Sequence, residues 1–90
     1  MDLKYDFSIQ EVADKYVAMA KNRETGSVEL VFNLNETGAF LLKALQDGRD
    51  IPTIVDMLTA EYDIQPAYAQ KEVQAFIDML IRKGLSSSRS

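Results

Sequence analysis

The sequence predicts an α+β fold in which a three-stranded antiparallel sheet at the N-terminal end is followed by three helices. Two observations support this prediction. Strand-like runs fill the first 34 residues, and apolar residues then recur at helical spacing between residues with capping character. Ninety residues fit one small domain. We expect a single domain over residues 1–85 and a disordered tail over residues 86–90, because "SSSRS" offers nothing to bury.

The predicted strands occupy Phe7 to Val12, Lys15 to Ala20 and Val28 to Leu34. Two residues separate the first pair, and the turn-forming stretch "KNRETGS" precedes the third, so both connections are expected to be hairpins. Alternation in the third strand predicts one face that packs against the helices, made by Val28, Leu30, Phe32 and Leu34.

The first two predicted helices have clear ends. Asn35 is an N-cap candidate for the first, which ends at Gly48, and Asp50 caps the second, which runs to about Tyr62 with Pro52 in its first turn. The expected buried residues are Phe40, Leu41, Ala44 and Leu45 in the first helix and Ile51, Ile54, Val55 and Leu58 in the second.

The third predicted helix, Pro66 to Lys83, stops at Gly84 and carries more apolar surface than a small core requires. Its primary stripe is Ala69, Val73, Phe76, Ile77 and Leu80, and a second, partly apolar stripe is Tyr68, Glu72, Ala75 and Met79. Two explanations stay open for the second stripe: it packs under the N-terminal strands, or it forms the wall of a groove for a partner.

Composition excludes several classes of function. The chain has no Cys and no His, which removes disulfides, thiolate nucleophiles, most zinc sites and the usual general base near neutral pH. The net charge is −4 and neither half is basic, which argues against nucleic acid and against anionic membranes as partners. No stretch approaches 18 apolar residues and the N-terminus lacks an apolar run, so we expect a cytoplasmic protein.

Two pairs of carboxylates invite a catalytic interpretation, but local structure explains them better. Glu11 with Asp14 and Asp47 with Asp50 are close in sequence. Asp14 falls in a turn, Asp47 precedes a turn glycine, and Asp50 is a helix cap. We therefore expect no catalytic residue and no metal site.

Beyond these local patterns, "VFNLNETGAFLLKALQDG", "IPTIVDML", "EYDI" and "VQAFIDMLIRKGL" resemble the PqqD-like family of small peptide chaperones, over roughly Val28 to Leu85. The family pattern is an Asn-led helix, an Asp-Gly turn and a closing Leu-x-x-Lys-Gly-Leu, and Asn35, Ala39, Leu42, Asp47 and Gly48 occupy the matching places. Members that serve pyrroloquinoline quinone synthesis itself carry a Tyr-Pro-Glu step before this helix. "VELVFNLN" lacks that step, which favours the broader family and leaves the substrate peptide open.

The resemblance implies a winged helix-turn-helix-like domain that does not bind DNA and needs no cofactor. Such a domain binds the leader of a ribosomally made precursor peptide and presents it to a modifying enzyme, commonly a radical SAM enzyme. The leader adds as a strand to the third strand and lies against the third helix. The implied peptide-binding residues are Val28, Glu29, Leu30, Val31, Phe32 and Asn33 on the strand and Tyr68, Glu72, Ala75, Phe76 and Met79 on the helix, with Lys71 and Lys83 facing acidic leader residues at the rim.

Two other functions remain open from the sequence. The chain could be an acidic winged-helix transcriptional regulator, or an interaction module that contacts a protein directly through the third helix. An exposed strand edge would also permit a homodimer in the absence of peptide.

Overall fold

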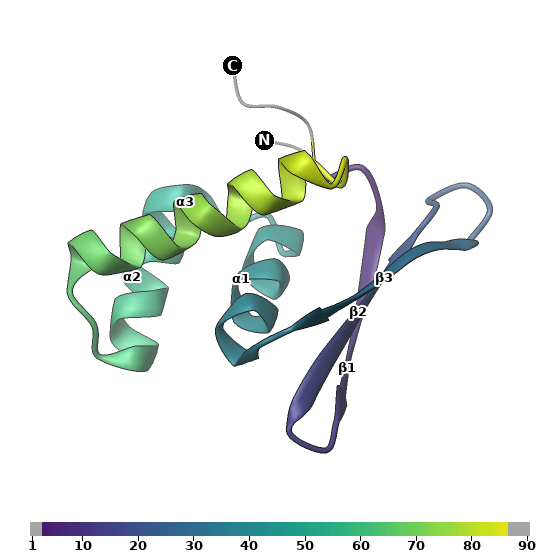
Figure 1. The fold of residues 1–90 in the computed structure, drawn as a ribbon. Coiled ribbons are helices and arrows are strands. Elements are labelled where there is room, and N and C mark those ends of the chain that lie inside the picture. Colours follow the sequence, from purple (N-terminus) through teal and green to yellow (C-terminus); the bar gives the residue numbers. More distant parts are fainter. Residues whose placement is uncertain (1–2, 87–90) are drawn as a thin grey trace.

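A computed structural model describes residues 3–86. The elements follow in the order β1 (Asp6–Val12), β2 (Lys15–Lys21), β3 (Val28–Leu34), α1 (Glu36–Gln46), α2 (Ile51–Tyr62) and α3 (Pro66–Arg82). The strands form one antiparallel sheet in the order β1-β2-β3, and the helices gather on one of its faces (Figure 1). The predicted α+β architecture is confirmed, with helix and strand ends within two residues of those expected.

The residues at the turns and helix ends explain why the elements begin and stop where they do. The Asn35 side chain accepts the Gly38 N–H at 2.7 Å, and the Asp50 side chain accepts the Thr53 N–H at 2.9 Å, so both predicted N-caps form. Gly48 and Gly84 have φ of 85° and 75°, a left-handed conformation that glycine adopts without steric cost just after a helix.

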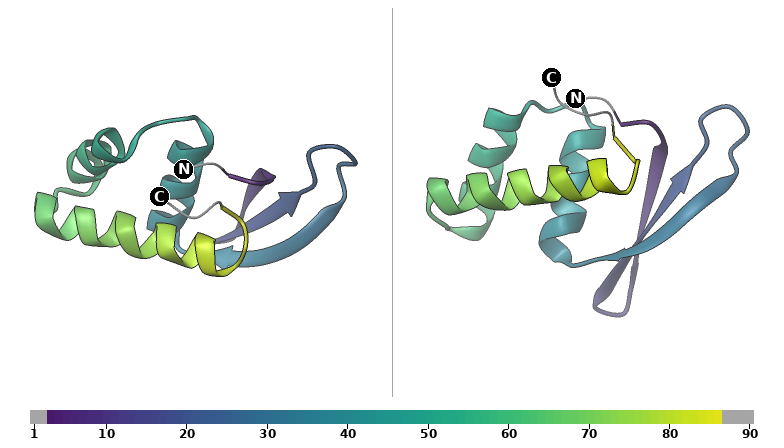
Figure 2. Two further views of the ribbon diagram at one scale, coloured as in Figure 1. Left: turned by 90° about the horizontal axis from the view of Figure 1, so that it is seen from above. Right: turned by 45° about the horizontal axis from the view of Figure 1, so that its top comes forward.

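Helix α1 lies between the sheet and the other two helices and contributes residues to two buried hydrophobic clusters. Leu42 packs with Phe7, Ala18 and Ala20 of the sheet and with Leu80. Leu41 and Ala44, on the opposite side of α1, pack with α2 and α3. Phe76 is partly buried against both clusters, so α3 is fixed relative to the sheet as well as to α2. The two turned views show α3 crossing α1 while the β2–β3 connection reaches away from the helices (Figure 2).

The inward face of β3 is one residue shorter than predicted. Ala20 pairs with Leu30, but Lys21 pairs with Val28, so Glu29 is an extra residue in the ladder. This β-bulge interrupts the alternation of side chains. Val28 is 48% exposed as a result, and the prediction that it packs against the helices is wrong; Leu30, Phe32 and Leu34 are partly buried as expected.

The C-terminal end of the described chain is tied to its beginning. The Lys4 N–H donates to the Leu85 carbonyl at 3.0 Å, and Ser86, which we assigned to the tail, is 2% exposed and bridges Leu3. The rest of the expected tail, residues 87–90, lies outside the described residues. Among residues 3–86, no helix is long and apolar enough to cross a membrane.

Candidate peptide-binding edge and groove

The sheet has two edges, β1 and β3, and a side chain covers part of the β1 edge. At β1, the Phe7 N–H donates to Gln46 Oε1 at 2.5 Å and Gln46 Nε2 donates to the Phe7 carbonyl at 3.0 Å. The primary amide of Gln46 therefore takes the place that a neighbouring strand would occupy. Within residues 3–86 the sheet ends at β3, with no strand beyond it. A strand edge without a partner presents backbone donors and acceptors for strand addition.

The pairing of Phe7 with Gln46 also fixes which groups of β3 face outward. Backbone groups in an antiparallel ladder alternate between the two sides of each strand. Because Phe7 directs both groups away from its partner Ala20, Ala20 must direct its own toward Leu30. The same alternation turns the N–H and C=O groups of Val31 and Asn33 toward the free edge.

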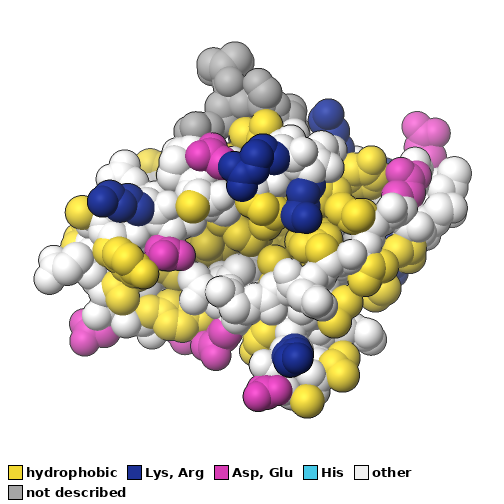
Figure 3. Space-filling view, in the orientation of Figure 1, with side chains coloured by type: hydrophobic (Ala, Val, Ile, Leu, Met, Phe, Trp, Pro, Cys, Tyr) yellow, Lys and Arg dark blue, Asp and Glu magenta, His cyan; other side chains and the backbone are white. Residues whose placement is uncertain are grey.

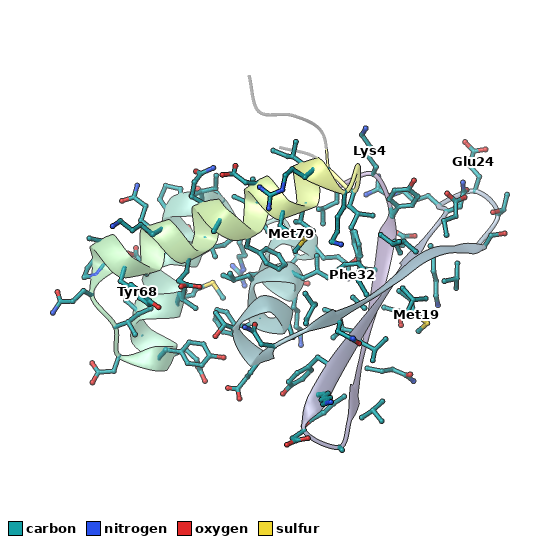
Figure 4. All side chains as sticks on the ribbon, in the orientation of Figure 1. Lys4, Met19, Glu24, Phe32, Tyr68 and Met79 are labelled. Carbon is teal, nitrogen blue, oxygen red and sulfur yellow. The ribbon has the colours of Figure 1, made fainter. Side chains whose placement is uncertain are left out.

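A groove lies beside the C-terminal end of this free edge, where β3, the start of α1 and the middle of α3 meet. Its volume is about 300 Å³, and its lining consists of Asn33, Leu34, Asn35, Thr37, Gly38, Leu41, Glu72, Ala75, Phe76 and Met79. Apolar side chains gather in the hollow between α3 and β3 (Figure 3), and Met79 and Phe32 both point into this region (Figure 4). An extended chain added to β3 would therefore lie along an apolar wall.

Close packing at the start of α1 shapes the floor of the groove. A Cβ placed on Gly38 would come within 3.1 Å of Asn35 Oδ1, 3.2 Å of Leu34 Cδ2 and 3.4 Å of Phe76 Cε1. Glycine at this position lets α3 approach the β3–α1 joint, and the cap bond from Asn35 holds the joint in place.

The structure places five of the thirteen predicted site residues in the lining of the groove. Asn33, Glu72, Ala75, Phe76 and Met79 line the groove. Glu29 lies in the bulge and accepts a hydrogen bond from Asn22 Nδ2 at 3.1 Å, while Val28, Leu30 and Val31 lie along β3.

The remaining predicted residues lie around the groove rather than in it. Lys83 Nζ lies 5.7 Å from the centroid of the Phe32 ring, a cation–π contact at one end of the groove. Tyr68 is 56% exposed and lines an adjoining pocket, whereas Lys71 is exposed on α3 and is not in the lining of either.

Sequence reasoning missed the residues that the α1 end contributes to the groove, namely Leu34, Asn35, Thr37, Gly38 and Leu41. Asn35 was assigned only as a cap, and the close contact of Gly38 with Phe76 joins residues 38 apart in the sequence. A local pattern carries no signal for such a contact.

Two tyrosines near the groove are paired with carboxylates. The hydrogen bond between Tyr68 and Glu72 raises the pKa of the Tyr68 phenol. The Tyr62 hydroxyl donates to Glu36 Oε2 at 3.1 Å, and burial followed by this bond raises the pKa of Tyr62. Among residues 3–86 no group of three or more acidic side chains is arranged to hold a metal ion. The chemistry that this surface offers is backbone pairing, apolar contact and charge.

Comparison with known proteins identifies the family. The family profile described as "Coenzyme PQQ synthesis protein D (PqqD)" matches residues 15–85. The chain belongs to the PqqD family. The match includes all of β2 and β3, the three helices and the closing Lys-Gly-Leu, so every described wall of the groove lies within the PqqD match. No curated protein sequence matches the chain significantly.

Two solved structures share the fold. One, TbiB1 in complex with the TbiA(beta) leader peptide, has a TM-score of 0.76 and 22% identity, and the match covers 100% of this chain and 99% of that one. The other, lasso peptide synthetase B1 complexed with the leader peptide, has a TM-score of 0.72 and 22% identity, and the match covers 97% of this chain and 96% of that one. At this identity the likeness shows that the shared fold extends over nearly the whole chain.

Proposed function

We propose that this PqqD-family chain is a non-catalytic adaptor that binds the leader of a ribosomally made precursor peptide. In this proposal the leader adds as a strand to β3, lies against α3, and is presented to a peptide-modifying enzyme. The observation that carries the proposal is the contrast between the edges: Gln46 covers β1, while β3 is open beside an apolar groove. The two solved structures that share the fold are both complexes with leader peptides, which supports the same function.

The geometry supports a recognition mode with two parts. The outward groups of Val31 and Asn33 offer two donors and two acceptors, and each hydrogen bond formed would contribute about 0.5–1.5 kcal/mol regardless of peptide sequence. Selectivity would come from the groove, because alternate side chains of an added strand point toward the same face. The flexible thioether of Met79 suits a wall that contacts apolar side chains of varied shape.

Charge would orient the peptide more than it strengthens binding. Lys83 lies over Phe32 at one end of the groove, where an acidic leader residue would be attracted, and exposed Lys71 could contribute at the rim. Both lysines are exposed, so the gain from each ion pair would be small and sensitive to salt.

The enzyme that receives the peptide is proposed to be a radical SAM or other peptide-modifying enzyme. The proposed location is the cytoplasm, where a ribosomal peptide is made. Without peptide, the open edge of β3 could pair with the same edge of a second copy, which would give a homodimer that the leader must displace.

The proposal is tested by purifying the chain from its native cell and identifying a short peptide and a large enzyme by mass spectrometry. The identified peptide is then titrated into labelled protein. We expect the largest NMR shifts at the amides of Val31 and Asn33 and along the groove side of α3. Shifts confined to another surface, such as the open face of the sheet around Met19 (Figure 4), would contradict the proposed site.

A further inference from the structure

A second pocket continues the groove past the end of β3. It has a volume of about 400 Å³ and lies where the start of α1, the end of α2 and the start of α3 meet. Its lining is Asn35, Thr37, Leu58, Tyr62, Ile64, Tyr68 and Glu72. Asn35, Thr37 and Glu72 also line the groove, so the two spaces adjoin.

The pocket combines aromatic and aliphatic walls with carboxylates. Ile64, which is partly exposed above the buried Leu58, gives it aliphatic surface, and Tyr62 and Tyr68 give it two phenol rings. Tyr68 is 56% exposed, an unusual degree for a large apolar ring, and it stands at the far end of α3 from Lys83 (Figure 4).

Each phenol has a carboxylate nearby. The Tyr62 hydroxyl donates to Glu36 Oε2 at 3.1 Å, and the carboxylate of Glu72 raises the pKa of the Tyr68 phenol. A phenol that donates its proton keeps its oxygen lone pairs free to accept from an incoming group.

The local charge is negative. No Lys or Arg is present in the lining of this pocket, and Lys71, the nearest lysine along α3, is exposed outside it. The N-termini of α1 and α3 point toward the same region, but each carries only about half a positive charge. The carboxylate of Glu36 in the first turn of α1 and the negative end of the α2 dipole offset these partial positive charges. The charge that remains at the pocket is that of the Glu72 carboxylate.

We propose that this pocket receives the side chain of a lysine or arginine of the bound peptide, at a position just beyond the stretch that pairs with β3. The methylene stem of such a side chain would pack on Ile64, and its cation would lie against the tyrosine rings and Glu72. An acidic side chain would be repelled, and a short polar one would leave the aliphatic wall uncovered. This inference rests on the proposed function, because the occupant is the same peptide.

With this assignment, the two ends of the groove attract side chains of opposite charge. Lys83 attracts an acidic residue at the Phe32 end, and Tyr68 with Glu72 attract a basic residue at the Asn35 end. A peptide with this charge order fits in one register, whereas backbone pairing alone tolerates shifts along the edge.

The test selects peptides from a random 16-residue display library on the immobilised wild-type protein. We expect the selected peptides to share an alternating apolar stretch and a Lys or Arg at a fixed offset from it. The same selection on the double variant Tyr68→Ser/Glu72→Gln should keep the apolar stretch and lose the basic position. Glu24→Gln changes the net charge in the exposed β2–β3 connection, far from the pocket (Figure 4), and should leave the basic position intact.

A selected peptide then gives a quantitative check. Replacing its basic residue by citrulline, a neutral side chain with nearly the shape of arginine, should weaken binding to the wild type about ten-fold. The same replacement should weaken binding to Tyr68→Ser/Glu72→Gln less than about two-fold if the cation occupies this pocket. Both tyrosine and glutamate are at the surface of the pocket, and unchanged NMR spectra elsewhere would show that the variant is folded.

The outcomes separate this inference from the proposed function. Selected peptides with the apolar stretch but no basic position, or equal citrulline losses in the wild type and the variant, would overturn the cation pocket alone. A library that yields no alternating apolar stretch, or peptides that do not shift β3 amides, would count against the proposed function itself.

Discussion

The register of the open edge leads to a prediction at the level of single backbone atoms. Replacing the Val31 N–H by an ester oxygen through semisynthesis removes one outward donor and leaves the side chain unchanged. If Val31 faces the peptide, the change should cost about 0.5–1.5 kcal/mol of binding free energy, which is roughly a 2- to 13-fold higher Kd. It should lower the free energy of unfolding by less than the loss of a hydrogen bond, because β2 does not use the Val31 N–H and the ester only weakens the Leu30 carbonyl as an acceptor toward Ala20.

The neighbouring residue provides a matched control. The same replacement at Phe32 removes a donor that points toward Ala18, so it should lower the free energy of unfolding more than the Val31 ester does. It keeps the outward Val31 N–H and only weakens the Val31 carbonyl as an acceptor, so peptide affinity should fall less than with the Val31 ester. Urea denaturation measures the first quantity, and fluorescence anisotropy with a labelled selected peptide measures the second. If Phe32 controls affinity and Val31 controls stability, our assignment of the alternation is inverted and the proposed edge contacts are wrong.

Three further predictions concern the groove, the closed edge and a helix cap. Met79→Asp should weaken peptide binding at least about ten-fold, because it places a charge on a half-buried apolar wall, whereas Met79→Leu should bind within about two-fold of the wild type; both are read by anisotropy. Gln46→Ala removes two hydrogen bonds to Phe7 and should lower the free energy of unfolding, measured by urea denaturation, by about 1–3 kcal/mol. The control is Gln70→Ala at an exposed position of α3, and an equal loss there would contradict the role of Gln46 in covering the edge. Hydrogen bonds that the Asp50 carboxylate accepts from Thr53 lower the pKa of Asp50 below its usual value of 3.8. The stabilising effect of the ionised cap is therefore present above about pH 4 and is lost as the pH falls through the lowered pKa, and Asp50→Asn should flatten that part of the stability profile.

The sequence predicts the elements well because their ends depend on local chemistry. Asn35 and Asp50 cap helices through their own side chains, and Gly84 ends α3 with a left-handed conformation, all within a few residues of the chain. The stripe of α3 that we expected to be buried is buried at Ala69, Val73, Ile77 and Leu80, since helical periodicity determines which side faces the core.

The misses involve contacts between distant residues. The bulge at Glu29 depends on how β2 and β3 align, so the exposure of Val28 could not follow from alternation within β3 alone. The bonds between Phe7 and Gln46 join residues 39 apart, and a glutamine in the last turn of a helix gives no sign that it will cover a strand edge. The second stripe of α3 was left between two explanations, and the structure does not choose between them at Met79, which packs against the core and also lines the groove.

The open part of the edge is short, and this shapes how recognition must work. An uncovered strand edge promotes aggregation, and the fold limits that risk with a bulge and an exposed Glu29 at the start of β3 and with Gln46 at β1. The regular stretch that remains open contains only two residues with outward backbone groups, Val31 and Asn33. Four hydrogen bonds at about 1 kcal/mol each would give at best millimolar affinity by themselves. If the chain binds a peptide as proposed, tight and selective binding must come from side chains in the groove and from the continuation of the peptide past Asn35. Substitutions at those positions should then decide which peptides it accepts.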